Sequence, residues 1–243
     1  MLKRFEAFTL AEVLITLGII GVVSAMTIPT LVANYQKTQY VTALKKAYSE
    51  INQALVKMAS DAGCPGDLSC ASTIFNSNSS ADELVSKLDN FASYFNAVKK
   101  CQAADGVCFS TQFSNYYDGS GVRGTGGGGP YSFIKADGVS YSVTPIECQP
   151  PPGYYGFDTT AEFKTYCGDM YIDVNGPNKG PNNFGMDVYH VWFTNGKGPV
   201  AVLQGAKSSG TQYWQTANSC NSSNKNGWSC GGRIVEEGWE MNY

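Results

Sequence analysis

The sequence predicts an α+β protein in which a long N-terminal helix packs on an antiparallel β-sheet. Three observations predict this class. An apolar run near the N-terminus continues into an amphipathic stripe, short β-prone runs between turn residues follow it, and eight cysteines lie beyond the stripe. We therefore expect a leader peptide at residues 1–7, a helix at residues 8–61 and a disulfide-stapled head at residues 62–243.

The first part of the predicted helix, residues 8–32, is apolar enough for a bilayer. Lys3 and Arg4 precede an apolar run from Val13 to Val32, close to the roughly 20 residues that span a membrane. Basic flanking residues stay in the cytoplasm, so the head is expected outside it. An ordinary secretory signal peptide is the alternative. However, Glu12 at the head of the run is costly in lipid without a partner, and a disposable signal has no use for it.

The second part of the predicted helix is amphipathic. Lys45, Lys46 and Glu50 lie off its apolar stripe, and Gly63 and Pro65 mark its end. Such a stripe is expected to pack on a sheet of the same chain. A two-chain coiled coil is the alternative, but the stripe spans too few heptads to favour it. The stripe consists of Val41, Leu44, Tyr48, Ile51, Leu55 and Met58.

Beyond residue 62, short β-prone runs alternate with turn residues, which is typical of an antiparallel sheet. One further helix is predicted from Asp82 to Lys100, where apolar residues recur every three or four positions. Asp137-Gly138 and Asn195-Gly196 are dipeptides typical of hairpin turns. The predicted strands are Tyr131–Ile134, Val139–Val143, Met170–Val174, Val188–Thr194 and Val200–Leu203.

The cysteines predict four disulfides and an oxidising compartment outside the cytoplasm. Their number is even, and neither a Cys-x-x-Cys motif nor a histidine-rich zinc pattern accompanies them. Buried free thiols are the alternative. Eight cysteines allow 105 connectivities, among which proximity in sequence suggests Cys64–Cys70, Cys101–Cys108, Cys148–Cys167 and Cys220–Cys230.

Composition and motifs disfavour two function classes. The net charge of −3 and the pI of about 5.2 give no basic field for nucleic acid. The single histidine, His190, lies within a predicted strand, and no nucleophile with a supporting acid is recognisable. We therefore interpret His190 as structural and do not expect an enzyme.

The segment Ala7-Phe8-Thr9-Leu10-Ala11-Glu12 resembles the processing motif of type IV prepilins: a basic leader, a small residue, an aromatic residue, Thr-Leu and a glutamate. Ala7 stands where the family usually has glycine. The resemblance implies that a prepilin peptidase cuts between Ala7 and Phe8 and methylates the new amine. It also implies that the Glu12 carboxylate neutralises the charge of this amine when subunits assemble.

The resemblance implies a pilin or a type II secretion pseudopilin without an active site. Its partners would be copies of itself or other pilins in a helical filament, the peptidase and an inner-membrane assembly platform. It would cross the inner membrane once, then enter an extracellular or periplasmic filament. Cys220–Cys230 resembles the C-terminal disulfide loop of many pilins. The alternatives are an anchored extracytoplasmic binding or adhesion protein at a filament tip and an anchored enzyme.

The segment from Ile172 to Val188 is the most organised part of the head. Asp173, Asn175, Asn182 and Asp187 supply oxygen atoms in a turn-rich loop between predicted strands, and a hard cation such as Ca²⁺ binds such donors with backbone carbonyls. The segment also resembles a stretch near the C-terminus of pilin-like proteins, some of which bind calcium in nearby loops. In the alternative interpretation, these side chains cap turns by accepting backbone N–H bonds.

Overall fold

The computed structural model describes most of the chain. The described part falls into two compact units, one ending at Gln39 and the other beginning at Tyr40, and each is treated separately. The described residues are 9–76, 79–102, 106–121, 123–125, 129–150, 165–195, 200–207, 214–215 and 219–243.

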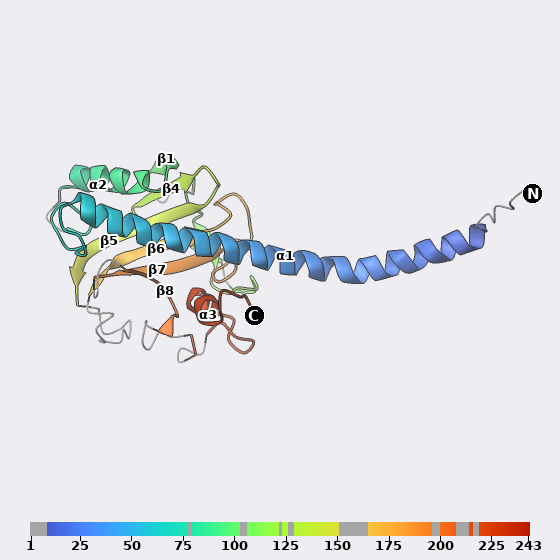
Figure 1. Ribbon diagram of the computed structural model, residues 1–243. Coiled ribbons are helices and arrows are strands. Elements are labelled where there is room, and N and C mark those ends of the chain that lie inside the picture. The colour runs from blue at the N-terminus through green and yellow to red at the C-terminus, as the bar shows by residue number, and fades with distance from the viewer. Residues whose placement is uncertain are drawn as a thin grey trace, which may run out of the picture. The chain divides into compact units, whose positions relative to one another are not determined.

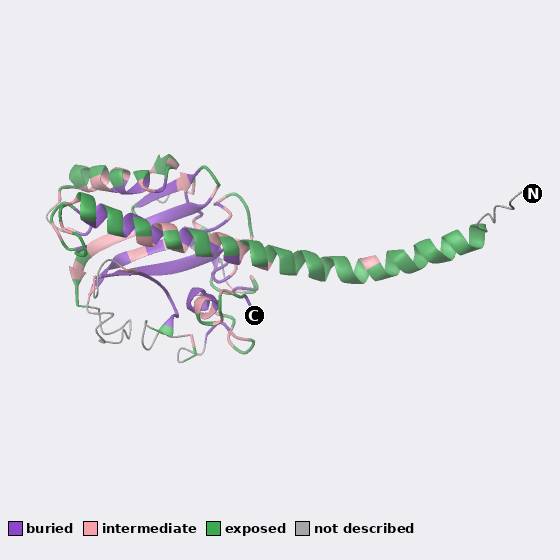
Figure 2. Cartoon of the chain, viewed as in Figure 1, coloured by how far each residue is buried: buried purple, intermediate pink, exposed green. Residues whose placement is uncertain are grey.

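The described part of the first unit is the beginning of helix α1 (Leu10–Asp61), which continues without a break through Pro29. Its apolar side chains are exposed, with Leu10 at 79% and Met26 at 73% (Figure 2). In the described chain, α1 is the one helix long and apolar enough to cross a membrane. Continuous apolar exposure on this scale marks a surface that lipid or protein covers.

An antiparallel sheet forms the centre of the second unit (Figure 1). In the described chain it has six strands in the order β1-β4-β5-β6-β7-β8. All five predicted strands are present, and β5 and β6 extend beyond the predicted bounds. The strands are β1 (Ala97–Cys101), β4 (Tyr131–Lys135), β5 (Ser140–Gln149), β6 (Tyr166–Asp173), β7 (Val188–Thr194) and β8 (Val200–Leu203).

One face of the sheet packs against the later part of α1 (Figure 1). The predicted stripe is buried there, apart from the half-buried Tyr48. The Tyr48 hydroxyl donates to the carbonyl of Ala201 at 2.7 Å, and the N–H of Ala201 donates to Asn52 Oδ1 at 3.0 Å. Because β8 is an edge strand, these bonds satisfy backbone groups that no neighbouring strand covers.

Helix α2 (Ala81–Ser93) also covers this face, but it is shorter than predicted. Ser80 caps its start by accepting the N–H of Glu83 at 3.3 Å. The prediction of a helix to Lys100 is wrong, because Asn96 adopts a left-handed backbone with φ of 53°. The chain then reverses, and β1 pairs with β4 instead.

The other face of the sheet is covered by loops and by the pair β2 (Gln112–Ser114) and β3 (Arg123–Thr125). Phe109, Phe113, Phe184 and Val188 form a hydrophobic cluster there. Helix α3 (Cys230–Glu236) packs beside β8, and its Ile234 belongs to the same core as α1. Neither β2, β3 nor α3 was predicted. The sheet is therefore buried on both faces, as Figure 2 shows for its central strands.

Four disulfides staple the second unit, and no cysteine is free. The pairs are those that proximity in sequence suggests. Each closes a short loop, which lowers the entropy of the unfolded chain and stabilises the fold by about 2–4 kcal/mol per bridge. They are Cys64–Cys70, Cys101–Cys108, Cys148–Cys167 and Cys220–Cys230.

Candidate functional site

Two parts of the chain carry the residues that the sequence singles out: the start of α1 and the loop between β6 and β7. Ala7 and Phe8, which flank the expected cut, lie outside the described residues. Thr9 is the first described residue and directly precedes α1.

Thr9 and Glu12 form a reciprocal capping box. Glu12 Oε2 accepts bonds from the N–H and the hydroxyl of Thr9, both at 2.8 Å. Thr9 Oγ1 in turn accepts the N–H of Glu12 at 3.3 Å. These bonds satisfy N–H groups that have no partner within the helix. Glu12 thus has a local role that the spacing Thr-x-x-Glu signals but that was not predicted.

Asp173 closes the end of β6 and anchors the loop that follows. Its Oδ1 accepts the N–H of Asn175 at 3.2 Å and the N–H of Gly176 at 2.8 Å. Gly176 has a left-handed φ of 91°, and a Cβ there would lie 2.5 Å from the carbonyl oxygen of Gly138. Only glycine therefore fits this turn against the β4–β5 hairpin.

Asp187 anchors the other end of the loop. Its two oxygens accept the N–H of Asn183 at 2.7 Å and the N–H of Asn182 at 2.9 Å. The Asp187 carbonyl accepts the N–H of Val174 at 2.9 Å, which joins both ends of the loop. Both aspartates thus perform the turn-capping role that the sequence left open as an alternative.

Three buried side-chain oxygens of this loop accept no hydrogen bond from the described residues: Asp173 Oδ2, Asn175 Oδ1 and Asn182 Oδ1. Asp173 is itself fully buried. Burial raises the pKa of the nearby Tyr40 hydroxyl, and the negative charges of Asp187 and Asp173 raise it further. The carboxylates of Asp173 and Asp187 therefore both lie near the Tyr40 hydroxyl.

The environment of Asp173 disfavours its ionised form. Burial raises the pKa of Asp173 to about 7, and the charge of Asp187 adds to the rise, although the N–H groups of Gly176 and Asn175 oppose it. Burial also raises the pKa of Asp187. Two buried carboxylates side by side resist ionising together, so the metal-free loop holds a proton more tightly than the unfolded chain does.

Because the folded loop holds this proton, the stability of Asp173→Asn relative to wild type is expected to depend on pH when a chelator is present. Asp173 titrates near 3.8 when unfolded and near 7 when folded, so ionisation destabilises the wild type progressively between these values. The neutral asparagine bears no such cost. The free energy of unfolding of the variant, relative to wild type, should rise by about 2–4 kcal/mol from pH 4 to pH 8.

Urea unfolding at several pH values checks this difference. Asp118→Asn serves as a control, because bonds from Lys225 and Ser120 lower the pKa of Asp118 to about 2. That variant should instead become less stable relative to wild type as pH rises through the acid range. If the free energy of unfolding of Asp173→Asn relative to wild type does not change with pH, the expectation is contradicted.

The donors of the loop suit a hard cation. No group of three His, Cys, Asp or Glu side chains gathers as metal ligands among the described residues. The loop instead combines two carboxylates with amide and backbone oxygens, which are ligands typical of Ca²⁺ and atypical of Zn²⁺. The unpartnered oxygens are the observation in favour of such an ion, because buried polar atoms are ordinarily paired.

His190 in β7 lies within an aromatic cluster. Its ring stacks on Tyr171 with centroids 4.5 Å apart and meets Trp192 and Trp228 edge-on at 5.8 and 5.6 Å. Its Nδ1 lies 2.5 Å from Gln204 Oε1. Its Nε2 lies 3.7 Å from Asp169 Oδ2. These contacts hold the ring in the core, and the interpretation of His190 as structural stays a prediction.

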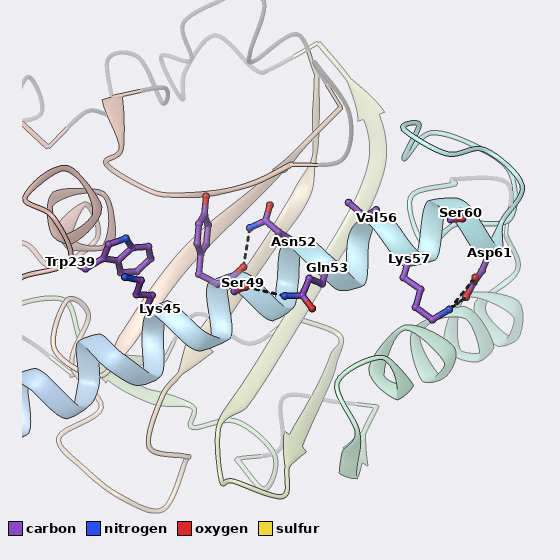
Figure 3. Close-up of a pocket in the computed structure, with 10 residues that line it drawn as sticks. Lys45, Ser49, Asn52, Gln53, Val56, Lys57, Ser60, Asp61 and Trp239 are labelled. Atoms are coloured by element: carbon purple, nitrogen blue, oxygen red, sulfur yellow. Dashed lines mark hydrogen bonds and ion pairs between the residues drawn. The ribbon is translucent and has the colours of Figure 1, made fainter.

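A shallow hollow lies on the outer side of α1, between its last turns and Trp239 (Figure 3). The Trp239 ring lies 5.8 Å from that of Tyr48, and Lys45 lies over its face. Further along, Lys57 pairs with Asp61 at 3.0 Å. The lining includes neither histidine nor cysteine.

Comparison with known proteins adds no relative. No family model, no curated protein and no solved structure matches the chain.

Proposed function

We propose that the chain is a structural subunit of a type IV pilus or a type II secretion-like filament, that is, a pilin or pseudopilin. The observation that carries the proposal is the first part of α1, which is apolar, exposed and headed by the single carboxylate of Glu12. A helix of this kind needs lipid before assembly and neighbouring subunits after it. The protein would act by packing rather than by catalysis.

Cleavage between Ala7 and Phe8 would give this helix a cationic end. The new amine on Phe8 would lie one peptide unit before Thr9, whose N–H bonds to Glu12 at 2.8 Å. Methylation leaves the charge in place. In a bundle of apolar helices, an amine and a carboxylate attract strongly because the dielectric is low. The pair would thus favour one register between subunits.

The second unit agrees with a location outside the cytoplasm. Its four disulfides form in an oxidising compartment, and the basic Lys3 and Arg4 favour the opposite side of the membrane. We place the chain in the inner membrane before assembly and in an extracellular or periplasmic filament afterwards. The prepilin peptidase, the assembly platform and other pilin subunits would be its partners.

Substitution of Glu12 by glutamine tests the proposal without removing the helix cap. Glutamine also serves at this position of a capping box, so the helix and its insertion should persist. Leaving one partner of a buried ion pair alone costs about 3–5 kcal/mol. We expect Glu12→Gln to remain in the membrane while its amount in sheared filaments falls by about tenfold or more, measured by immunoblot in the native host.

Thr9→Ala is the matched control, because it removes the capping hydroxyl and keeps the charge. It should lose about 1 kcal/mol of helix stability and still enter filaments. Equal incorporation of Glu12→Gln and wild type would refute the assembly role. Mass spectrometry of the mature protein gives a second check: an N-terminus at Met1, or one beyond the apolar run, would overturn the proposed processing.

A further inference from the structure

We infer that the hollow on the outer side of α1 binds an acidic polysaccharide, with Trp239 packing on a sugar ring and Lys45 pairing with a carboxylate. The residues that line the hollow all belong to the second unit, so the inference does not rest on the filament proposal. Its volume of about 730 Å³ is within the range of ligand sites in proteins. The lining combines aromatic rings, polar side chains and two lysines (Figure 3).

Trp239 lies at one end of the hollow in a backbone conformation that bulky residues rarely adopt. Its φ is 66°, in the left-handed region, and its N–H donates to the carbonyl of Ile234 at 2.7 Å, which holds this turn. The side chain is only half-buried. Glycine would form the same turn at a lower cost, so the turn alone does not explain the indole. Strain of this kind is frequent at ligand sites.

A half-buried indole that lines an open hollow suits a sugar ring. One face of a pyranose ring carries C–H bonds, which pack on an aromatic surface, while its hydroxyl groups point outward from the ring edge. The Trp239 ring offers such a surface, and the Tyr48 ring 5.8 Å away supports it from the side of α1. The position of the indole is therefore fixed before a ligand binds.

The side of α1 that forms the floor of the hollow is polar. Lys45, Ser49, Gln53 and Lys57 recur every four residues and form one ridge along the helix. Gln53 Nε2 donates to Ser49 Oγ at 3.0 Å, which leaves the Gln53 oxygen and the Ser49 hydroxyl proton for a ligand (Figure 3). A second helix would need an apolar stripe here, but Val56 is the one large exposed apolar side chain among the described lining residues. The ridge thus favours hydroxyl groups over a packed helix.

The charges of the hollow favour an anion. Lys57 pairs with Asp61 at 3.0 Å, whereas Lys45 forms no ion pair within the described chain and has its ammonium 5.5 Å from the centre of the Trp239 ring. A sugar packed on the indole would therefore bring its carboxylate within reach of Lys45. Two lysines against one aspartate give the lining a net positive charge. Because the lysines lie roughly 18 Å apart along the helix, a chain of uronic acids complements the hollow better than a single sugar.

Calorimetric titration of the full-length protein tests the inference. The detergent must be zwitterionic, because a sugar head group would compete for the hollow. An oligomer of galacturonic acid is the probe, and its carboxyl-reduced form, an oligomer of galactose of equal length, is the neutral comparison. We expect heat from the acidic oligomer and several-fold weaker binding of the neutral one. High salt should abolish this preference, because it screens exposed charges.

Two variants separate the role of the indole from that of the ammonium. Trp239→Gly removes the ring and suits the left-handed backbone, so the fold should persist while the affinity for both oligomers falls by about tenfold or more. Lys45→Gln should weaken binding of the acidic oligomer several-fold and leave that of the neutral one unchanged. Lys225→Gln is the matched control, since Lys225 pairs with Asp118 at 2.6 Å and does not line the hollow. It should change either affinity by less than about twofold.

The inference is overturned if the wild type gives no heat with the acidic oligomer or binds the neutral one equally well. It is also overturned if Trp239→Gly or Lys45→Gln binds the acidic oligomer as tightly as wild type, because the oligomer would then bind elsewhere. Dimers in detergent that Trp239→Gly converts to monomers, with no binding of the oligomer, would show instead that a second copy covers the hollow.

Discussion

Replacement of Phe133 by alanine is expected to lower the free energy of unfolding by about 3–5 kcal/mol. Phe133 is fully buried on the face of the sheet that α1 and α2 cover. Its ring lies 5.1 Å from that of Phe95 and 5.0 Å from that of Tyr141. Truncation would remove contacts to a loop, a strand and the helix layer at once, and the rigid rings around it would close the cavity only partly.

Urea unfolding with the disulfides intact measures this effect. Val98→Ala is the matched control, since Val98 is 65% exposed on the edge strand β1. It loses little buried surface and should change the free energy by less than about 0.5 kcal/mol. A loss below about 1 kcal/mol for Phe133→Ala would mean that the aromatic layer is not the core of the second unit.

The elements that the sequence predicts well are those whose burial leaves a period in the chain. The stripe from Val41 to Met58 recurs at helical spacing because one side of α1 faces the sheet. Strand β7 (Val188–Thr194) matches its prediction to the residue because it is rich in β-branched and aromatic residues and is buried on both faces. These signals are local and need no knowledge of distant residues.

The elements that the sequence predicts poorly depend on contacts with residues far away in the chain. Strand β1 carries exposed lysines and continues the helical pattern of α2, so its sequence reads as helix. It becomes a strand through pairing with β4 and through the left-handed Asn96. Helix α3 contains two glycines, which disfavour helices, and it forms where the chain packs on a distant loop.

The same distinction applies to the candidate sites. The oxygen-rich loop after Asp173 is visible in sequence because its donors and turn residues are neighbours. The position of Ser140 opposite Asp173 could not be predicted from the sequence, because it depends on the register in which β5 pairs with β6. The cap between Thr9 and Glu12 is local and has a known spacing, so it could have been predicted.

Gly232→Ala is expected to destabilise the C-terminal part of the second unit by about 3 kcal/mol or more. A Cβ at Gly232 would lie 1.8 Å from the backbone nitrogen of Ala206 and 1.8 Å from the carbonyl carbon of Gly205. The N–H of Gly232 donates to the carbonyl of Gln204 at 2.8 Å, which fixes this close approach. Because both obstacles are backbone atoms, no change of rotamer relieves the clash, and α3 must move away from the end of β8.

Gly231→Ala, one residue earlier in the same helix, is the matched control. Its Cβ would meet the Leu203 side chain at 3.0 Å, and the nearest atom, Cδ2, belongs to a flexible end that is able to shift. Both substitutions gain about 1 kcal/mol in helix propensity, so this gain cancels when they are compared in urea. Gly231→Ala should stay within about 1 kcal/mol of wild type. Equal stability of the two variants would show that α3 does not approach the loop at residues 204–206 this closely.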